Sequence, residues 1–427
     1  MNRITALVRT VFKTPSLRNK LLFTAAIFFI FRLLAHIPLP SVDITQLRNL
    51  LGSSQFLSLL NVFSGGTLSN FSVVAVGINP YITATIVIQL ASMVIPSLKE
   101  MQKDGESGRE RVNQYARLLS VPLAVGQSIS VLVLLRSQGL LLTSDPLSLI
   151  TMIVSLVAGA LILTWLGELV SQYGLGNGIS MILLGGILSQ LPQAVSQLAV
   201  VSSSDQLLVL SAFAVLFLFI IAAVVFMNEA VRKVSIQYAQ RLRGSRVYGG
   251  QQTHLPIKVN VAGVMPIIFA VSIMLIPSFL ARLLSATKVD SLIKLGQEMT
   301  ALFAQTSMVY IVSYFVVVFA FTFFSALIFF NAEDISTELK KSGAFLPGIR
   351  PGSATKRFLE YVVMRVTVAG AVFLSLIAVM PSLAQRFTDI GSLAVSGTSV
   401  LIVVSVILET AKQIEGMLVE QNYDRYL

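Results

Sequence analysis

Uncharged apolar stretches of 18 or more residues recur along the whole chain, and they restrict the fold more than any other feature. About 20 apolar residues are what a helix needs to cross a bilayer. Hydrophobic residues make up 55% of the chain and charged residues 12%, which is too apolar for a soluble domain. The sequence therefore predicts an all-α polytopic membrane protein. The uncharged stretches are 118–135, 146–167, 206–228, 261–281, 299–332, 366–385 and 390–408, besides 70–98 and 169–204, which each hold one span and a loop.

Adding 21–37, which contains Arg32, gives ten predicted spans and places both chain ends on one side of the membrane. The Lys and Arg residues favour that side by about four to one, which marks it as cytoplasmic. The basic start of the chain lacks an Ala-x-Ala cleavage pattern, so we expect an uncleaved first helix. The predicted regions are a cytoplasmic N-terminal segment (1–20), an N-terminal half (21–204, helices one to five), a C-terminal half (205–416, helices six to ten) and a cytoplasmic tail (417–427).

Two segments far apart in the chain share the pattern Gly-x-x-Pro-x-Ile-x-Ala. It begins at Gly77 and again at Gly263, where long apolar stretches start. Helix breakers at matching places of two halves indicate a membrane pathway between repeated units. A weaker likeness links 178–183 with 397–402, so that the second span pairs with the seventh and the fifth with the tenth. Two halves of five spans would run in opposite directions, as an inverted repeat; chance similarity between membrane helices is the alternative.

The chain offers little for catalysis or metal binding. Its two histidines, His36 and His254, lie far apart in the sequence, and it has no cysteine. It also lacks a phosphate-binding loop and a Gly-x-Ser-x-Gly elbow. We therefore expect no enzyme activity, no catalytic or metal-binding residue and no cofactor. Energy for any transport would come from a partner or a gradient.

The residues just after the helix breaks are aliphatic, whereas coupled carriers usually place ionisable groups near the membrane midplane. Lipid contact or plain packing would explain any one of them. Because Ile82 matches Ile268 and Leu183 matches Ile402, inverted symmetry would instead bring them together between the halves. A narrow apolar collar excludes water and ions, yet it can stretch around a passing chain. The residues concerned are Ile82, Ile86, Ile179, Leu183, Ile268 and Ile402.

Four longer connections carry polar or charged residues. The half-apolar segment 38–71 would lie either in an outward-facing mouth or as an interfacial helix on the bilayer. The charged loops 99–117, 228–260 and 331–365 would face the cytoplasm, where their basic residues could bind anionic lipid or nucleic acid. In the last loop, two Pro-Gly pairs predict an ordered finger that holds Arg350 between two turns.

Several long segments resemble the SecY family of protein-conducting channel subunits. The most specific are SVVAVGINPYITATIVIQL at 72–90 and WLGELVSQYGLGNGIS at 165–180. Shorter matches lie at 61–66, 253–260, 340–352 and 397–399, so the resemblance covers essentially the whole chain. It implies a clamshell of two inverted five-helix halves around an hourglass pore, with a side opening to lipid between the second and third and the seventh and eighth helices.

The resemblance also implies roles for single residues. The six aliphatic residues fall on the family's pore ring, where Leu183 replaces the isoleucine of some relatives. Arg246 and Arg350 fall on cytoplasmic arginines that engage the ribosome or the SecA motor; Arg350 matches better, because Ser245 stands where relatives can carry a second arginine. Gln89 would lie near the side opening, held by a hydrogen bond or by helix packing. The plug that closes the outer funnel is implied within about 55–71, at Phe63, Ser64, Gly65, Gly66, Thr67, Leu68 and Ser69.

These observations predict a passive channel in the plasma (inner) membrane of a bacterium. It would conduct unfolded secretory polypeptides and release transmembrane segments sideways into lipid. The implied partners are SecE and SecG subunits, the SecA motor or the ribosome, preprotein signal sequences, nascent chains and membrane lipid. The alternative is a secondary carrier for a small solute, which would need a polar midplane site and would show saturable uptake.

Overall fold

The computed structural model describes residues 14–40, 42–53, 61, 64–142, 145–190, 204–238, 241–243, 246–248, 252–261, 263, 265–285, 289–304, 306–388 and 392–424. Helices dominate this part of the chain, as the sequence predicts. They are α2 (Pro15–Leu34), α3 (Ile44–Ser53), the short 3-10 helix η1 (Leu68–Asn70), α5 (Asn79–Val94), α6 (Pro96–Lys103), α7 (Glu106–Ser137), α8 (Pro146–Tyr173), α9 (Gly178–Leu188), α11 (Ser204–Glu229), α12 (Met265–Ser285), α13 (Asp290–Leu302), α14 (Met308–Phe329), α15 (Ala332–Lys341), α16 (Ser353–Thr388) and α17 (Ser392–Asp424).

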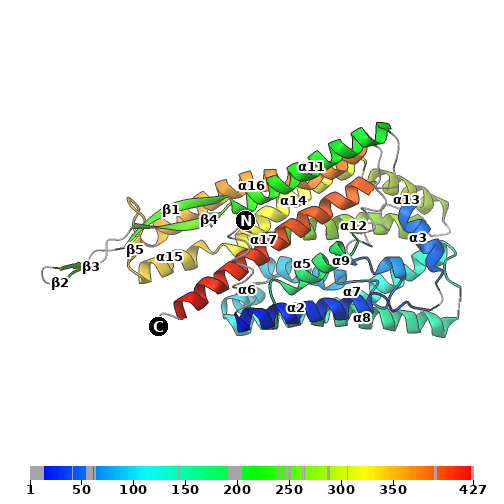
Figure 1. The fold of residues 1–427 in the computed structure, drawn as a ribbon, viewed down its shortest axis with the longest axis horizontal. Coiled ribbons are helices and arrows are strands. Elements are labelled where there is room, and N and C mark those ends of the chain that lie inside the picture. Colours follow the sequence, from blue (N-terminus) through cyan, green and yellow to red (C-terminus); the bar gives the residue numbers. More distant parts are fainter. Residues whose placement is uncertain are drawn as a thin grey trace.

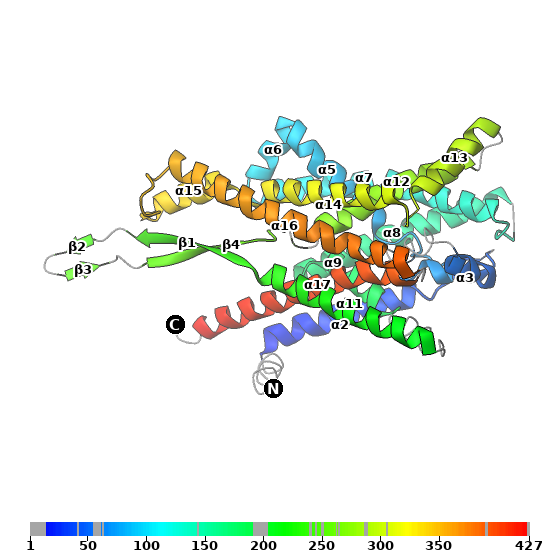
Figure 2. The same cartoon turned by 90° about the horizontal axis from the view of Figure 1, so that it is seen from above.

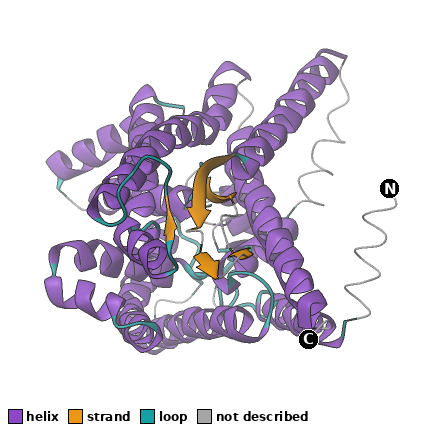
Figure 3. Cartoon of the chain, turned by 90° about the vertical axis from the view of Figure 1, so that its left-hand side faces the viewer, coloured by secondary structure: helices purple, strands orange, loops and turns teal. Residues whose placement is uncertain are grey.

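The helices form two bundles that follow the order of the chain. In Figure 1, the bundle of α2 to α9 lies below the bundle of α11 to α17. The start of α2, the end of α17, α15 and the strands lie at one end of the molecule, whereas α3 and α13 lie at the other (Figure 2). Seen from the end with the strands, the strands project near the centre of the surrounding helices (Figure 3).

The shared Gly-x-x-Pro pattern has the same local structure in both halves. Gly77 and Gly263 both adopt a left-handed backbone, with φ of 68° and 63°. Each helix then begins two residues later, α5 at Asn79 and α12 at Met265, with the proline as its second residue. Glycine tolerates the left-handed turn and proline fits the first turn of a helix, which explains why these two residue types recur. The second likeness differs, because α9 begins at Gly178 whereas Gly397 lies inside α17.

A helix occupies each of the ten predicted apolar segments. Within the described residues, four helices are long and apolar enough to cross a membrane: Glu106–Arg136, Pro146–Tyr173, Met308–Lys341 and Ser353–Leu383. The α5 and α6 pair bends by 108° at its break, as a broken span or a re-entrant loop would, and α9 and parts of α11 and α12 are apolar but shorter. These helices agree with a multi-pass membrane protein, while the ten spans stay a prediction.

The predicted cytoplasmic loop 99–117 is mostly helical, which corrects the sequence interpretation. Helix α6 extends to Lys103 and α7 begins at Glu106. Glu, Arg, Gln and Ala favour helices, so a high charge content marks this stretch as exposed without making it a loop. The Arg117 guanidinium of α7 donates a hydrogen bond to the Glu168 carboxylate of α8 and forms an ion pair with it. This contact joins α7 to α8.

The loop 228–260 contains a β-hairpin. Strand β1 (Val231–Tyr238) pairs antiparallel with β4 (Gln252–Lys258), and β5 (Ala344–Phe345) pairs with the other edge of β1. Farther out, β2 (Arg241–Arg243) pairs with β3 (Arg246–Tyr248). A small apolar cluster from this sheet, α15 and α16 contains Val234, Ile257, Ala332, Leu346, Leu359 and Val363. The sheet thereby fixes both predicted cytoplasmic loops to each other.

Candidate functional site

The six aliphatic residues come from four helices, two in each half. Ile82 and Ile86 lie on α5, Ile179 and Leu183 on α9, Ile268 on α12 and Ile402 on α17. Five of them belong to one buried cluster that draws on both halves, with exposed fractions of 3% or less, and Ile179 is half-buried against it. The structure therefore brings all six positions into one region.

Other aliphatic residues of the same helices point outward, which argues against lipid contact for the six predicted residues and leaves plain packing and the collar as interpretations. On α5, Val87 is 44% and Val94 is 81% exposed; on α17, Ile407 is 49% exposed. These side chains lie where lipid would contact a membrane protein. The six predicted residues instead face the interior, so lipid contact does not explain them. Their role as a pore ring stays a prediction.

Local sequence signals fix the direction of these side chains. On α5 and on α9 the two residues are four positions apart, so they lie one above the other on the same helix face. The start of α9 is set by Asn177, whose side-chain oxygen accepts hydrogen bonds from the backbone nitrogens of Ile179 and Ser180 (3.1 and 3.3 Å). This cap holds the first turn of α9, and with it Ile179, at a fixed place in the fold.

The two halves meet along two seams of different character. On one side α12 packs against α5 and α7, and on the other α9 packs against α17. The second seam carries polar contacts: the backbone N–H of Gly176 donates to the Gln413 side chain (2.7 Å), and the Thr410 hydroxyl, which donates to the Val406 carbonyl of its own helix (2.8 Å), lies 3.7 Å from the Met181 sulfur. Sequence reasoning missed Gln413 and Thr410, because nothing local marks a polar residue as one that bridges two halves.

Gln89, predicted at the side opening, lies on α5, the helix of the first seam. It is half-buried, and its backbone oxygen accepts a hydrogen bond from the Ser92 hydroxyl (2.7 Å). Its assignment to the opening stays a prediction.

The predicted plug residues from Ser64 to Ser69 form a compact turn, while Phe63 lies outside the described residues. Thr67 is fully buried, and its hydroxyl lies 2.8 Å from the Ser64 carbonyl and 2.9 Å from the Val74 carbonyl. The backbone N–H of Ser69 donates to the Asn61 side chain (3.0 Å). Leu68 is buried in a second apolar cluster. Side-chain hydrogen bonds thus hold the segment in shape without a regular helix.

Helix α3 of segment 38–71 packs on protein through its described side chains, which argues against an interfacial helix on the bilayer. Leu47 and Leu51 of α3 are buried, at 0% and 8% exposure, in the cluster that also contains residues of α7 and α8. The Asp43 carboxylate begins α3 by accepting hydrogen bonds from Thr45 and Gln46. The Thr45 hydroxyl and the Gln46 backbone N–H stabilise the charged carboxylate and lower the pKa of Asp43.

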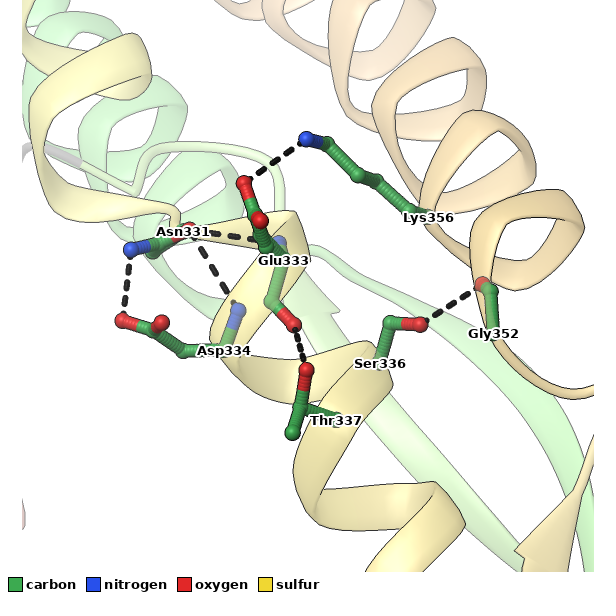
Figure 4. Close-up of polar contacts among 7 residues, drawn as sticks. All are labelled: Asn331, Glu333, Asp334, Ser336, Thr337, Gly352 and Lys356. Atoms are coloured by element: carbon green, nitrogen blue, oxygen red, sulfur yellow. Dashed lines mark hydrogen bonds and ion pairs between the residues drawn. The ribbon is translucent and has the colours of Figure 1, made fainter.

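Arg350 is exposed in a loop that the surrounding residues hold firmly. Turns at 347–348 and 351–352 flank it, as the two Pro-Gly pairs predict. The Thr355 hydroxyl donates to the Arg350 carbonyl (3.0 Å), and the buried Ser336 hydroxyl of α15 donates to the Gly352 carbonyl (2.8 Å). Figure 4 shows this bond beside the ion pair between Lys356 and Glu333 (2.8 Å). The charge at position 350 is therefore presented on an ordered loop. Arg246 lies in β3, near the outer tip of the hairpin (Figure 1).

We expect Ser336→Ala to loosen the Arg350 loop. The change removes the hydrogen bond from α15 to the Gly352 carbonyl, which keeps its bond from the Lys356 backbone N–H (3.0 Å), and the lost bond costs about 1 kcal/mol. Amide hydrogen exchange of residues 346–352 should become roughly fivefold faster. Thr337→Ala is the matched control, because the Thr337 hydroxyl bonds only within α15, to the Glu333 carbonyl (2.8 Å). Equal exchange rates in the two variants would contradict this account of the loop.

No cluster of three or more His, Cys, Asp or Glu residues that could hold a metal ion occurs among the described residues. The candidate site instead consists of apolar side chains enclosed between the two helical bundles. This arrangement is typical of membrane channels whose constriction is apolar.

Comparison with known proteins identifies the family. The chain belongs to the SecY family, whose sequence model matches residues 72–411. Protein translocase subunit SecY of Streptomyces galbus is 38% identical over 99% of this chain and all of that protein, and the SecY of Mycobacterium bovis is 38% identical over 97% of this chain and 98% of that one.

Solved structures share the fold at low sequence identity. One described as the structure of a protein conducting channel has a TM-score of 0.64 at 16% identity and covers 93% of this chain and 91% of that chain. Sec61 in the canine ribosome–channel complex has a TM-score of 0.58 at 17% identity, with the same coverage. These likenesses place the described helices in the SecY and Sec61 fold.

Proposed function

We propose that this protein is the channel subunit of a bacterial protein translocase. Unfolded secretory polypeptides pass between its two halves, and apolar segments leave sideways into lipid. The observation that carries the proposal is that five of the six aliphatic residues, from α5, α9, α12 and α17, belong to one large buried apolar cluster drawn from both halves, with Ile179 packed against it. Apolar side chains at a constriction repel water and ions, and because they form no specific bonds they part for chains of any sequence. The relatives named protein translocase subunit SecY support the same function.

The difference between the seams supports an opening on one side. Separating α9 from α17 would break the bond of Gly176 to Gln413 and the contact of Thr410 with Met181. We assign this seam to the hinge. The contact of α12 with α5 and α7 then becomes the side opening to lipid, with Gln89 on one of its helices. The clamshell of ten spans in two inverted halves is part of the same proposal.

We place the end with the β-hairpin, α15 and Arg350 in the cytoplasm and the membrane in the bacterial inner membrane, with both chain termini cytoplasmic. The excess of basic residues on this side supports the orientation. Arg350, and Arg246 near the hairpin tip, are proposed contacts for the SecA motor or the ribosome, and SecE and SecG are the proposed companion subunits. Sec61, which shares the fold, is described in a ribosome–channel complex, which supports a partner on this face. The channel itself carries out no chemical reaction.

The plug segment, residues 63–69, is proposed to close the outward side at rest. One structural neighbour, with a TM-score of 0.61, is described as having a plug domain that stabilises the closed state of the translocation channel and maintains a membrane seal. In this chain the corresponding turn is buried and held by its own hydrogen bonds.

Transport into vesicles tests the proposed function. The protein is reconstituted with a small SecE-like partner, SecA, ATP and a radiolabelled preprotein, and the protease-protected preprotein is measured. We expect protection that needs both ATP and this chain, with empty vesicles as the control. No protection by correctly inserted protein, or saturable uptake of a small solute in its place, would contradict the proposal.

A further inference from the structure

The last turn of α9 contacts the plug segment through backbone alone. A Cβ atom added to Gly186 would lie 2.2 Å from the Cα of Gly65 and 3.0 Å from its carbonyl carbon. Ordinary contacts between carbon atoms are about 3.5–4.0 Å, so only glycine fits at position 186. From the other side, a Cβ on Gly65 would meet the Gly186 Cα at 3.1 Å and the ring of the buried Phe31 at 2.9 Å. The two glycines therefore form a tight joint between the plug segment and α9.

Neighbouring hydrogen bonds also hold the plug segment against the end of α9. The Gln190 side-chain amide donates to the Asn61 carbonyl (3.4 Å), the same carbonyl that accepts the backbone N–H of Gly66 (2.7 Å). The last turn of α9 is fixed in turn by Arg32 of α2, whose guanidinium donates to the Ser189 hydroxyl (2.9 Å). This explains a basic residue inside a predicted apolar span: Arg32 holds the end of the helix on which the plug segment rests.

Gly186 also connects the plug segment to the aliphatic cluster. It follows Leu183 by three positions on α9, and residues three apart in a helix lie on neighbouring parts of one face. A displacement of the plug segment at Gly186 would therefore change the packing next to Leu183.

We propose that Gly186 is the seat of the plug segment and determines how tightly the resting channel is closed. This inference rests on the proposed channel function. Gly186→Ala is the direct test, because alanine favours a helix more than glycine does, so α9 itself is not weakened. The added methyl group must displace the backbone of Gly65, which cannot rotate away as a flexible side chain can.

The experiment measures resting ion conductance in planar bilayers that hold the protein with its SecE-like partner. We expect Gly186→Ala to raise the open fraction at rest by about tenfold or more, as overpacking of a tight contact shifts an equilibrium. Gly185→Ala is the matched control. The atoms nearest to its Cβ would be those of the Phe28 ring, at 2.8 Å, and that half-buried side chain can turn aside, so the conductance of this variant should equal that of the parent.

Deletion of 63–69 separates the two levels of the proposal. A leak in the deletion variant together with parental conductance in Gly186→Ala would overturn the seat and leave the channel function intact. No leak in the deletion variant and in a variant of the aliphatic cluster would overturn the channel function itself.

A cross-link gives a second reading that needs no change at Gly186. The chain has no native cysteine, so the pair Asn61→Cys and Gln190→Cys is unique. A short bifunctional maleimide should join the pair in the resting protein, and adding Gly186→Ala should reduce the yield several-fold. An absent cross-link with intact Gly186, or an unchanged yield in the triple variant, would contradict the seat.

Discussion

Replacing Ile82 and Ile268 together with Asn is expected to make the resting protein leak ions. Both side chains are almost fully buried, at 3% and 2% exposure, on the two helices whose starts share the Gly-x-x-Pro pattern. A buried amide without a hydrogen-bond partner costs roughly 1–3 kcal/mol, and amides at both positions would recover this cost by binding water. Water in the constriction removes the barrier that an apolar collar presents to ions.

Planar-bilayer conductance measures this effect, and we expect an increase of at least about tenfold over the parent, since a wetted constriction no longer gates by dewetting. Replacing Val87 and Ile276 with Asn is the control, because these residues lie on the same helices but are 44% and 47% exposed. Ile82→Leu with Ile268→Leu should stay sealed. Parental conductance in the inserted Asn variant would count against the aliphatic cluster as the seal.

Reversing the charge of Arg350 is expected to abolish most partner-driven transport while the protein stays folded and inserted. The side chain is exposed, and its backbone is fixed between two turns, so little of the fold depends on it. Complementary charge speeds association by about 10- to 1,000-fold, and Arg350→Glu replaces attraction with repulsion toward an acidic partner. We expect ATP-dependent preprotein transport to fall by at least about tenfold for this reason.

Lys340→Glu is the matched control for Arg350→Glu. It makes the same charge change at an exposed position of α15, at the same end of the molecule. If both variants lose transport equally, the effect reflects overall charge and the specific role of Arg350 is wrong. Unchanged transport by Arg350→Glu would exclude that role altogether.

The sequence predicted the parts of the site that depend on local rules. Gly77 and Gly263 mark left-handed turns that only a few residue types tolerate, and the prolines after them mark helix starts, so matching breaks could be read from the chain alone. Ile82, Ile86 and Ile268 follow these breaks in the sequence, whereas Ile179, Leu183 and Ile402 came from the weaker likeness of 178–183 with 397–402. The interior position of the six is an outcome of tertiary packing that the pattern could only suggest.

Contacts between segments far apart in the chain could not be predicted from the sequence. The joint of Gly65 with Gly186 joins residues more than a hundred positions apart, and its only local sign is a pair of glycines inside α9, where glycine weakens a helix. The bond from Gly176 to Gln413 has no local sign. The helical form of 99–117 was missed because charge was weighed more heavily than helix propensity.

The most direct test of the account is to ask which residues a polypeptide in transit touches. A preprotein with one cysteine is stalled during transport, and cysteines are introduced one at a time at Ile86 and Ile402, from opposite halves of the cluster, and at the outward-facing Val94 and Ile407. The account predicts that the stalled chain forms disulfides with positions 86 and 402 and with neither outward position. Disulfides at 94 and 407 in place of 86 and 402 would contradict it.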